Sequence, residues 1–347
     1  MVNVSEKVIA TVRKFEDEKD FNDFLSKIER LYKFKVRRFR FNLGKCTNMI
    51  NLEDTCEAIL KMKSCFSDIK VMVDIGYPGT GVRINLLPGE YEKELVKNEE
   101  ILFVSSEYVG EKSNNIIFLN SNNLFNLFLE NKIVYYRDGE SAFIVKRILS
   151  KDKAVALPMD NIKIETNQSL KCCSYIKENN VNDLIREIIN STNPEEIALS
   201  FVEKPEDVMS FKMKFPQFKS KIISKIETSD SVHNLKNIID ISDSIMVARG
   251  DLAFNSDLSD LYFYQNKIIK ETRQNKKEVY VATDILGSLS KKAFPSRSDV
   301  IDLASIISQD VSGIILNGPL VVSRNIGYAL ELIEEMFNKN ANGKLSY

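Results

Sequence analysis

The sequence predicts a (β/α)8 barrel that carries a small β-rich insertion after its third strand. Eight short runs rich in β-branched residues recur along the chain, and most are followed by stretches whose apolar residues fall at i, i+3, i+4 and i+7. Such alternation is typical of a parallel sheet covered by helices. The rhythm is interrupted once, between about residues 85 and 158.

The eight runs define the expected strands. They are Lys7–Val12, Val36–Phe41, Ile69–Asp74, Ile197–Val202, Lys221–Ile226, Ser244–Ala248, Glu278–Ala282 and Gly313–Leu316. Amphipathic stretches that begin at Asp20 and Asp257 are examples of the helices between them. No G-x-G-x-x-G follows the first run, which disfavours an open dinucleotide-binding sheet and favours the closed barrel.

The interrupted segment contains short alternating runs, such as NNIIFLN and AFIVKRIL, separated by Gly, Asn and Ser. Alternation of this kind is typical of antiparallel strands, and the segment is too long for a plain loop between a strand and a helix. We therefore expect residues 1–84 and 159–347 to form the barrel and residues 85–158 to form an inserted β-rich domain. This domain would be either a lid over the barrel mouth or a passive addition.

Composition excludes several classes of protein. The chain has 347 residues, is 44% hydrophobic, and has 48 Lys and Arg residues against 49 Asp and Glu, so no global charge recruits nucleic acid or anionic lipid. Its first residues contain no apolar signal region, and no run approaches a membrane span. The five cysteines match no zinc spacing, which suggests reduced thiols and a cytoplasmic protein. The basic and aromatic run KFKVRRFRF is better explained as a barrel strand than as a nucleic-acid surface.

Polar residues lie at the C-terminal ends of seven of the eight expected strands. A (β/α)8 barrel carries its chemistry at the C-terminal ends of its strands, so these side chains should meet at one end of the barrel. They are Asn42, Asp74, Ser200, Lys225 with Glu227, Arg249 with Asp251, Thr283 and Asn317.

The most informative pair is Lys225 and Glu227, which lie two residues apart and therefore project to the same side of an extended strand. Asp251 follows the next strand, and Mg²⁺ prefers one or two carboxylates with water and substrate oxygens. A lysine beside that ion would neutralise charge on a phosphoryl or enolate oxygen, and Gly250 would let the backbone approach a ligand. The alternative is a simple salt bridge between Lys225 and one carboxylate.

SKIET at Ser224–Thr228 and MVARGDLA at Met246–Ala253 resemble the two signature strands of the pyruvate kinase family. The resemblance implies that Lys225 is the active-site lysine and that Glu227 and Asp251 bind Mg²⁺. It extends over nearly the whole chain through shorter motifs. These are RFRFNLGKCT with Arg40 and Asn42, MVDIGYPGTGVRI with Asp74 and Arg83, ALSFVEKPEDV with Ser200, VATDILGS with Thr283, and PSRSDVIDLA with Arg297.

The family resemblance also implies roles for these residues. Arg40 would help Lys225 to stabilise the transferring phosphoryl group, and Thr283 would lie near the carbon that is protonated. Substrate contacts are implied for Gly250, Arg83 and Ser200. Asn42 and Asp74 would border a site for a monovalent cation such as K⁺.

Several positions depart from the family pattern. Gly44 and Ile75 stand where hydroxyl residues are usual, which weakens the K⁺ site, and Lys45 could supply a fixed charge in its place. Arg13-Lys14 and Asn317–Leu320 alter the nucleotide side, and Arg137 replaces an aspartate of the family's lid domain. The chain ends where the family's third domain would begin, so we expect a monomer or dimer instead of the usual tetramer.

The resemblance therefore implies Mg²⁺-dependent phosphoryl transfer between phosphoenolpyruvate and ADP or ATP. Two alternatives stay open: related Mg²⁺-enolate chemistry on another oxo-acid in a specialised biosynthetic pathway, and a non-catalytic ligand-binding homologue. His233 is the single histidine, and we interpret it as a surface residue, so no histidine base is expected.

Overall fold

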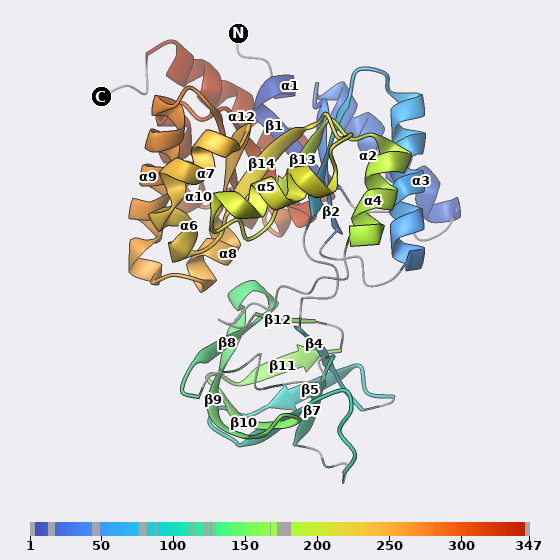
Figure 1. Cartoon of the computed structure of the whole chain (residues 1–347), viewed down its shortest axis with the longest axis vertical. Helices are drawn as coiled ribbons and strands as arrows, with labels where there is room; N and C mark the ends of the chain where they lie inside the picture. The colour runs from blue at the N-terminus through green and yellow to red at the C-terminus, as the bar shows by residue number, and fades with distance from the viewer. Residues whose placement is uncertain are drawn as a thin grey trace. The chain divides into compact units, whose positions relative to one another are not determined.

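The computed structural model describes residues 4–12, 18–43, 49–75, 82–87, 89–110, 113, 115–120, 124, 128, 130–166, 168–171 and 182–343. The chain divides into two compact units (Figure 1). The first combines Met1–Pro78 with Asn180–Tyr347, and the second is Gly79–Asn179.

The first unit is a closed barrel of eight parallel strands. Its strands are β1 (Val8–Val12), β2 (Arg38–Asn42), β3 (Lys70–Ile75), β13 (Glu196–Leu199), β14 (Lys221–Ile226), β15 (Ser244–Ala248), β16 (Glu278–Ala282) and β17 (Gly313–Leu316). They follow each other around the barrel in chain order, and β1 pairs with both β2 and β17 to close it. The eight predicted runs are these eight strands, so the predicted fold class is confirmed. The fourth strand ends three residues earlier than predicted because Phe201 adopts a left-handed backbone with φ 52°.

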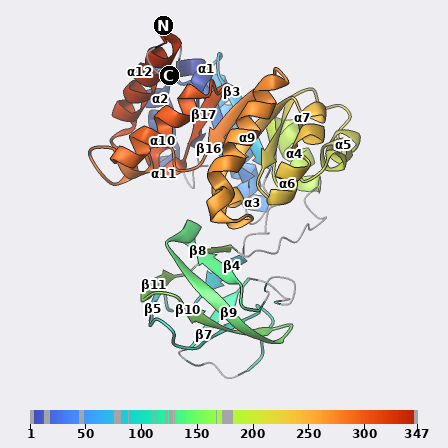
Figure 2. The ribbon, with the colours of Figure 1, turned by 90° about the vertical axis from the view of Figure 1, so that its left-hand side faces the viewer.

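Helices lie around the outside of the strands (Figures 1 and 2). They are α1 (Val4–Lys7), α2 (Glu18–Lys33), α3 (Met49–Cys65), α4 (Asn182–Thr192), α5 (Pro205–Lys214), α6 (Ser229–His233), α7 (Leu235–Ile241), α8 (Arg249–Phe254), α9 (Leu261–Gln274), α10 (Arg297–Ser308), α11 (Gly318–Val321) and α12 (Ile326–Ala341). Short 3₁₀ turns, η4 (Leu258–Asp260) and η5 (Gly287–Ser290), precede α9 and α10. Among the described residues, no helix combines the length and apolarity that crossing a membrane requires.

The helices are held by periodic apolar faces and by caps. In α2, Phe24, Ile28 and Leu31 are buried at spacings of four and three residues, which places them on one face toward the strands. The side chain of Ser296 caps α10 by accepting a hydrogen bond from Asp299 N at 3.1 Å. Such faces are what the sequence pattern predicted.

An apolar layer fills the middle of the barrel. It consists of Ile9, Met72, Ala198, Ile223, Met246, Tyr280, Ala282 and Ile315. Side chains two residues apart on a strand face the same side of the sheet. The residue two positions after each member of this layer therefore also faces the interior, nearer the C-terminal end of the barrel. At four positions these are polar: Thr11 on β1, Asp74 on β3, Ser200 just after β13, and Lys225 on β14. Strand alternation alone therefore converges polar groups at one end of the interior.

A second polar cluster lies nearer the other end of the barrel interior. Arg38 of β2 forms an ion pair with Glu196 of β13 at 2.5 Å, and Arg38 Nη2 also donates to the hydroxyl of Tyr280 at 3.1 Å. Arg38 and Glu196 are both buried. Burial raises the pKa of Tyr280, so this residue stays a neutral phenol.

The second unit is built from strands. Seven form a closed barrel: β4 (Val82–Asn85), β6 (Ile101–Val104), β7 (Ile116–Leu119), β8 (Ile133–Tyr136), β9 (Ser141–Ser150), β10 (Lys153–Pro158) and β12 (Ser169–Lys171). Two more, β5 (Glu92–Leu95) and β11 (Ile162–Glu165), pair with each other, and η2 (Arg137–Gly139) follows β8. The pairs are antiparallel except for β6 with β7. The unit is wider than the expected segment 85–158 because β4, β11 and β12 also pair within it.

Candidate active site

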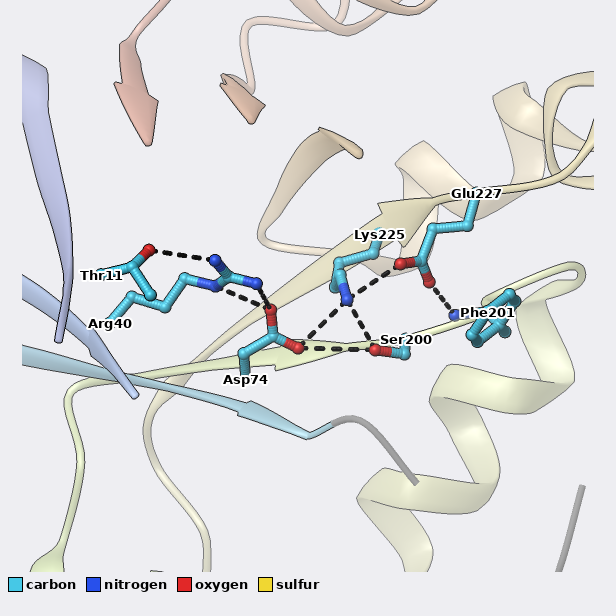
Figure 3. Close-up of polar contacts among 7 residues, drawn as sticks. All are labelled: Thr11, Arg40, Asp74, Ser200, Phe201, Lys225 and Glu227. Atoms are coloured by element: carbon cyan, nitrogen blue, oxygen red, sulfur yellow. Dashed lines mark hydrogen bonds and ion pairs between the residues drawn. The ribbon is translucent and has the colours of Figure 1, made fainter. Parts of the chain in front are cut away.

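The polar cluster at the C-terminal end of the barrel is centred on the ammonium group of Lys225, at the end of β14 (Figure 3). Lys225 Nζ donates to Ser200 Oγ at 2.7 Å and to Asp74 Oδ1 at 3.1 Å. It also lies 2.9 Å from Glu227 Oε1. The sequence left open a salt bridge between Lys225 and a single carboxylate, and in the structure Lys225 contacts two.

Asp74, on β3, is fully buried between two cations. Its Oδ2 accepts from Arg40 Nε at 2.8 Å and also lies 2.6 Å from Arg40 Nη2, while Lys225 contacts Oδ1. Arg40 Nη1 in turn donates to Thr11 Oγ1 at 3.0 Å, which fixes the guanidinium. Burial opposes the charge of Asp74, but Lys225 and Arg40 outweigh it and bring the pKa of this carboxyl below its ordinary value.

The two oxygens of Glu227 have different partners. Oε2 accepts from the backbone nitrogen of Phe201 at 2.5 Å, which the left-handed turn after β13 places there. Oε1 is buried, and its partner is the ammonium group of Lys225, which lies 2.9 Å away in an ion pair. Burial raises the pKa of Glu227 to about 7; the charge of Lys225 lowers it, and the carboxylates of Asp251 and Asp74 raise it.

Lys225 remains charged in this cluster. Burial alone would lower its pKa, but Asp74 and Glu227 together raise it above its ordinary value. Asp251, in the first turn of α8, also acts on Lys225 and Glu227 electrostatically. Lys225 thus interacts with three carboxylates, Asp74, Glu227 and Asp251, whereas Arg40 pairs with Asp74.

The donor set fits a hard divalent cation. Glu227 offers a buried oxygen whose partner is the ammonium group of Lys225, and Asp251, in the helix that follows the neighbouring strand, supplies a second carboxylate. Within the described parts of the chain no three His, Cys, Asp or Glu side chains form a metal-binding group. Two carboxylates completed by water and substrate oxygens are the arrangement that Mg²⁺ accepts and that Zn²⁺ sites do not usually have.

Thr283 follows β16 with a positive φ of 78° and is half-buried. A Cβ added at Gly250 would meet Thr283 Cγ2 at 2.9 Å, so the side chain of Thr283 packs directly on this glycine. Gly250 immediately precedes Asp251, the candidate metal ligand, in the chain. The structure accordingly brings Gly250 and Thr283 together.

The other predicted site residues lie as follows. Asn42 ends β2 and is the register partner of Asp74. Arg83 lies on β4 of the second unit, where its backbone nitrogen donates to Asn120 Oδ1 at 2.6 Å. Gly44, Lys45 and Arg13-Lys14 lie outside the described residues. His233 is exposed at the end of α6, as predicted.

Sequence reasoning missed two contributors, Thr11 and the backbone nitrogen of Phe201. Thr11 carried a usable signal, because it is the polar residue on the inward-facing side of β1, two positions after Ile9. The role of Phe201 N–H depends on a left-handed turn, for which a phenylalanine gives no warning.

Fold and site together define the class of protein: a (β/α)8 barrel with a buried lysine–carboxylate centre at the C-terminal ends of its strands. The family model "Pyruvate kinase, barrel domain" matches residues 5–321. The chain therefore belongs to the pyruvate kinase family.

Curated relatives agree with this assignment. The chain is 28% identical to pyruvate kinase of Thermotoga maritima over 351 aligned positions, which cover 99% of this chain and 72% of that protein. It is 25% identical to pyruvate kinase of Thermococcus litoralis, with 95% and 68% covered. Over 125 positions it is 36% identical to pyruvate kinase of Clostridium perfringens, which is 35% of this chain and 26% of that protein.

Proposed function

We propose that this protein catalyses Mg²⁺-dependent phosphoryl transfer between phosphoenolpyruvate and a nucleotide, ADP or ATP. The observation that carries the proposal is the charged, buried Lys225, whose ammonium group lies 2.9 Å from a buried carboxylate oxygen of Glu227. Phosphoryl transfer needs little covalent help from the protein and depends on positioning and charge neutralisation. A lysine held in place by Asp74 and Ser200 is suited to that task.

Glu227 and Asp251 would hold the Mg²⁺ ion. When bound, the ion supplies positive charge to the substrate's carboxylate and enolate oxygens. An ion at Glu227 Oε1 would take the place of the ion pair with Lys225, but Asp74 and Ser200 would still hold the ammonium group. Lys225 would then be free on its remaining side to contact the transferring phosphoryl group.

Arg40 and Thr283 would complete the site. Arg40 is oriented by Thr11 and Asp74 and would add a second positive charge at the phosphoryl group. Thr283, packed on Gly250, would bring its hydroxyl near the substrate carbon that is protonated. Gly250 and Ser200 would border the substrate. Arg83, on the second unit, and a weakened K⁺ site at Asn42 and Asp74 belong to the proposal by resemblance alone.

One observation favours a second candidate, Mg²⁺-enolate chemistry on a related oxo-acid. Asn317 replaces a serine of the family's nucleotide-side loop, and its Oδ1 accepts a hydrogen bond from Leu320 N at 3.2 Å to cap α11. The chain thus keeps the Lys225–Glu227 centre, while its loop on the nucleotide side differs from the family pattern. Decarboxylation or aldol cleavage would use the same centre without a phosphoryl acceptor.

The test is to incubate the protein with Mg²⁺, phosphoenolpyruvate and ADP and to follow pyruvate. Lys225→Met should abolish turnover. Lys221→Met is the matched control, because Lys221 lies on the same strand but is exposed and pairs with Glu278 at 3.1 Å; it should retain turnover.

The outcomes separate the candidates. No turnover, with Mg²⁺-dependent binding of oxalate or phosphoenolpyruvate in calorimetry, would reject the phosphotransferase and favour the second candidate. No Mg²⁺-dependent binding of either compound would indicate a non-catalytic homologue. Turnover that survives Lys225→Met would remove Lys225 from the mechanism.

A further inference from the structure

The turn that carries Thr283 has an unfavourable backbone. Thr283, Asp284 and Leu286 have φ values of 78°, 55° and 50°. Left-handed φ is uncommon for residues with a Cβ, and for a β-branched residue such as threonine it is an outlier. Such a conformation persists only where surrounding contacts impose it.

Arg249 supplies contacts of that kind. Its Nε donates to the carbonyl oxygen of Thr283 at 3.1 Å, and its Nη2 donates to the same oxygen. Its Nη1 donates to both carboxylate oxygens of Asp302, on α10, at 2.8 Å each. The Arg249 side chain is 12% exposed. The guanidinium thus ties the strained residue to a helix.

The chemistry of arginine suits this bridge. A guanidinium has donors on both edges of a rigid plane, so it can bind a carbonyl oxygen and a carboxylate at the same time. A lysine has a single ammonium group on a flexible stem and cannot reproduce the fork. Asp302 holds the plane in orientation through two charge-assisted hydrogen bonds.

The residue after Arg249 fixes the other side of the turn. Gly250 has no Cβ, and a Cβ there would be 2.9 Å from Thr283 Cγ2 and 3.3 Å from Thr283 Oγ1. Arg249 therefore holds the backbone of Thr283, and Gly250 leaves room for its side chain. Asp251, the candidate metal ligand, comes next in the chain.

We propose that Arg249 is a positioning residue, which with Asp302 holds Thr283 in its left-handed conformation so that the threonine side chain stays packed on Gly250, the residue before Asp251. The catalytic part of this inference rests on the proposed function. The structural part, a clamp on a strained turn, stands independently of it. A purely structural ion pair between α8 and α10 would stabilise the barrel without controlling the turn, and this is the alternative to be tested.

The first test measures amide hydrogen exchange by mass spectrometry in peptides that span residues 283–290. In Arg249→Met, exchange there should be faster by at least about tenfold, since the charge-assisted contacts that oppose local opening are lost. Arg249→Lys should not restore slow exchange. Arg273→Met is the matched control, because it removes another arginine–aspartate pair, to Asp310, on the surface of the barrel unit, and it should leave the turn unchanged.

Asp302→Asn is the second variant, in case Arg249→Met does not fold. It keeps both bonds from Arg249 to Thr283 but removes the anchoring charge, so exchange in 283–290 should lie between wild type and Arg249→Met. Unchanged exchange at 283–290 in folded Arg249→Met, or in Asp302→Asn when only that variant folds, would overturn the clamp.

The second test is kinetic. In Arg249→Lys, kcat should fall by about tenfold to a hundredfold, while KM for phosphoenolpyruvate should change by less than about threefold. This pattern is expected because the variant would misplace Thr283, which acts in the reaction and does not anchor the substrate. A raised KM with unchanged kcat would overturn the positioning role. If the wild-type protein does not turn over phosphoenolpyruvate, the proposed function fails, and the exchange experiment alone decides the clamp.

Discussion

Glu227 should make the stability of the protein fall as pH rises through neutrality. Its buried carboxyl has a pKa of about 7 in the folded protein against an ordinary value of 4.5. Between these values the folded state binds a proton that the unfolded state has released. Stability therefore decreases with rising pH across this window. Glu227→Gln replaces the carboxyl with a neutral group of the same shape and should remove the effect.

The magnitude follows from the difference between the two pKa values. The shift from 4.5 to about 7 corresponds to a contribution of up to about 3 kcal/mol between pH 4.5 and 8. Asp74 does not add to the slope in this range, because its pKa is lowered and its contribution is lost only in acid. The pKa of Lys225 is raised above 10.5, so this residue would change the pH dependence of stability only in strong alkali.

The assay is urea unfolding of wild type and Glu227→Gln at pH 5 and pH 8, in the presence of a chelator. The wild type should lose more unfolding free energy than the variant between the two pH values, by up to about 3 kcal/mol. Added Mg²⁺ should recover part of the loss at pH 8 in the wild type only, because the ion replaces the proton on Glu227. Identical pH dependence in the two proteins would refute the reasoning.

Three further predictions concern other contacts. Gly250→Ala should lower turnover and reduce the free energy of unfolding in urea by about 1–3 kcal/mol, because the new methyl group clashes with Thr283 Cγ2. The double variant with Thr283→Ser should recover part of this stability, and an unchanged stability of Gly250→Ala would contradict the tight packing. Arg38→Met should destabilise the barrel by about 3–5 kcal/mol in the same assay, because it leaves Glu196 buried without its partner, whereas a surface ion pair would cost far less. Because both oxygens of Asp74 are already paired with cationic side chains, turnover should persist when tetramethylammonium replaces K⁺; an absolute requirement for K⁺ would disprove this.

The fold was predictable because it depends on local periodicity. Each barrel strand is a short apolar run between amphipathic helices, and such runs can be found without knowledge of their neighbours. The convergence of Lys225, Glu227 and Asp74 could also be anticipated, since it requires only strand alternation and the rule that barrel chemistry lies at strand ends.

The contacts across the barrel could not be predicted in the same way. The pairing of Arg38 with Glu196 joins β2 with β13, which are separated by β3 around the barrel, and their proximity depends on strand register and barrel closure. The bridge from Arg249 to Thr283 depends on left-handed φ values that ordinary residue types conceal. The sequence pattern does not mark the end of the second unit, because β12, a strand of three residues, gives almost no periodic signal.

The apolar layer between the two polar clusters of the barrel affects how substitutions in the two clusters combine. Ile9, Met72 and Ile223 separate the pair of Arg38 and Glu196 from the Lys225 centre, so neither cluster makes a hydrogen bond to the other within the described contacts. Substitutions without shared partners tend to be additive in their effects on stability. The charges that the chemistry requires can therefore be altered at one end of the barrel while the pair at the other end continues to hold the strands together.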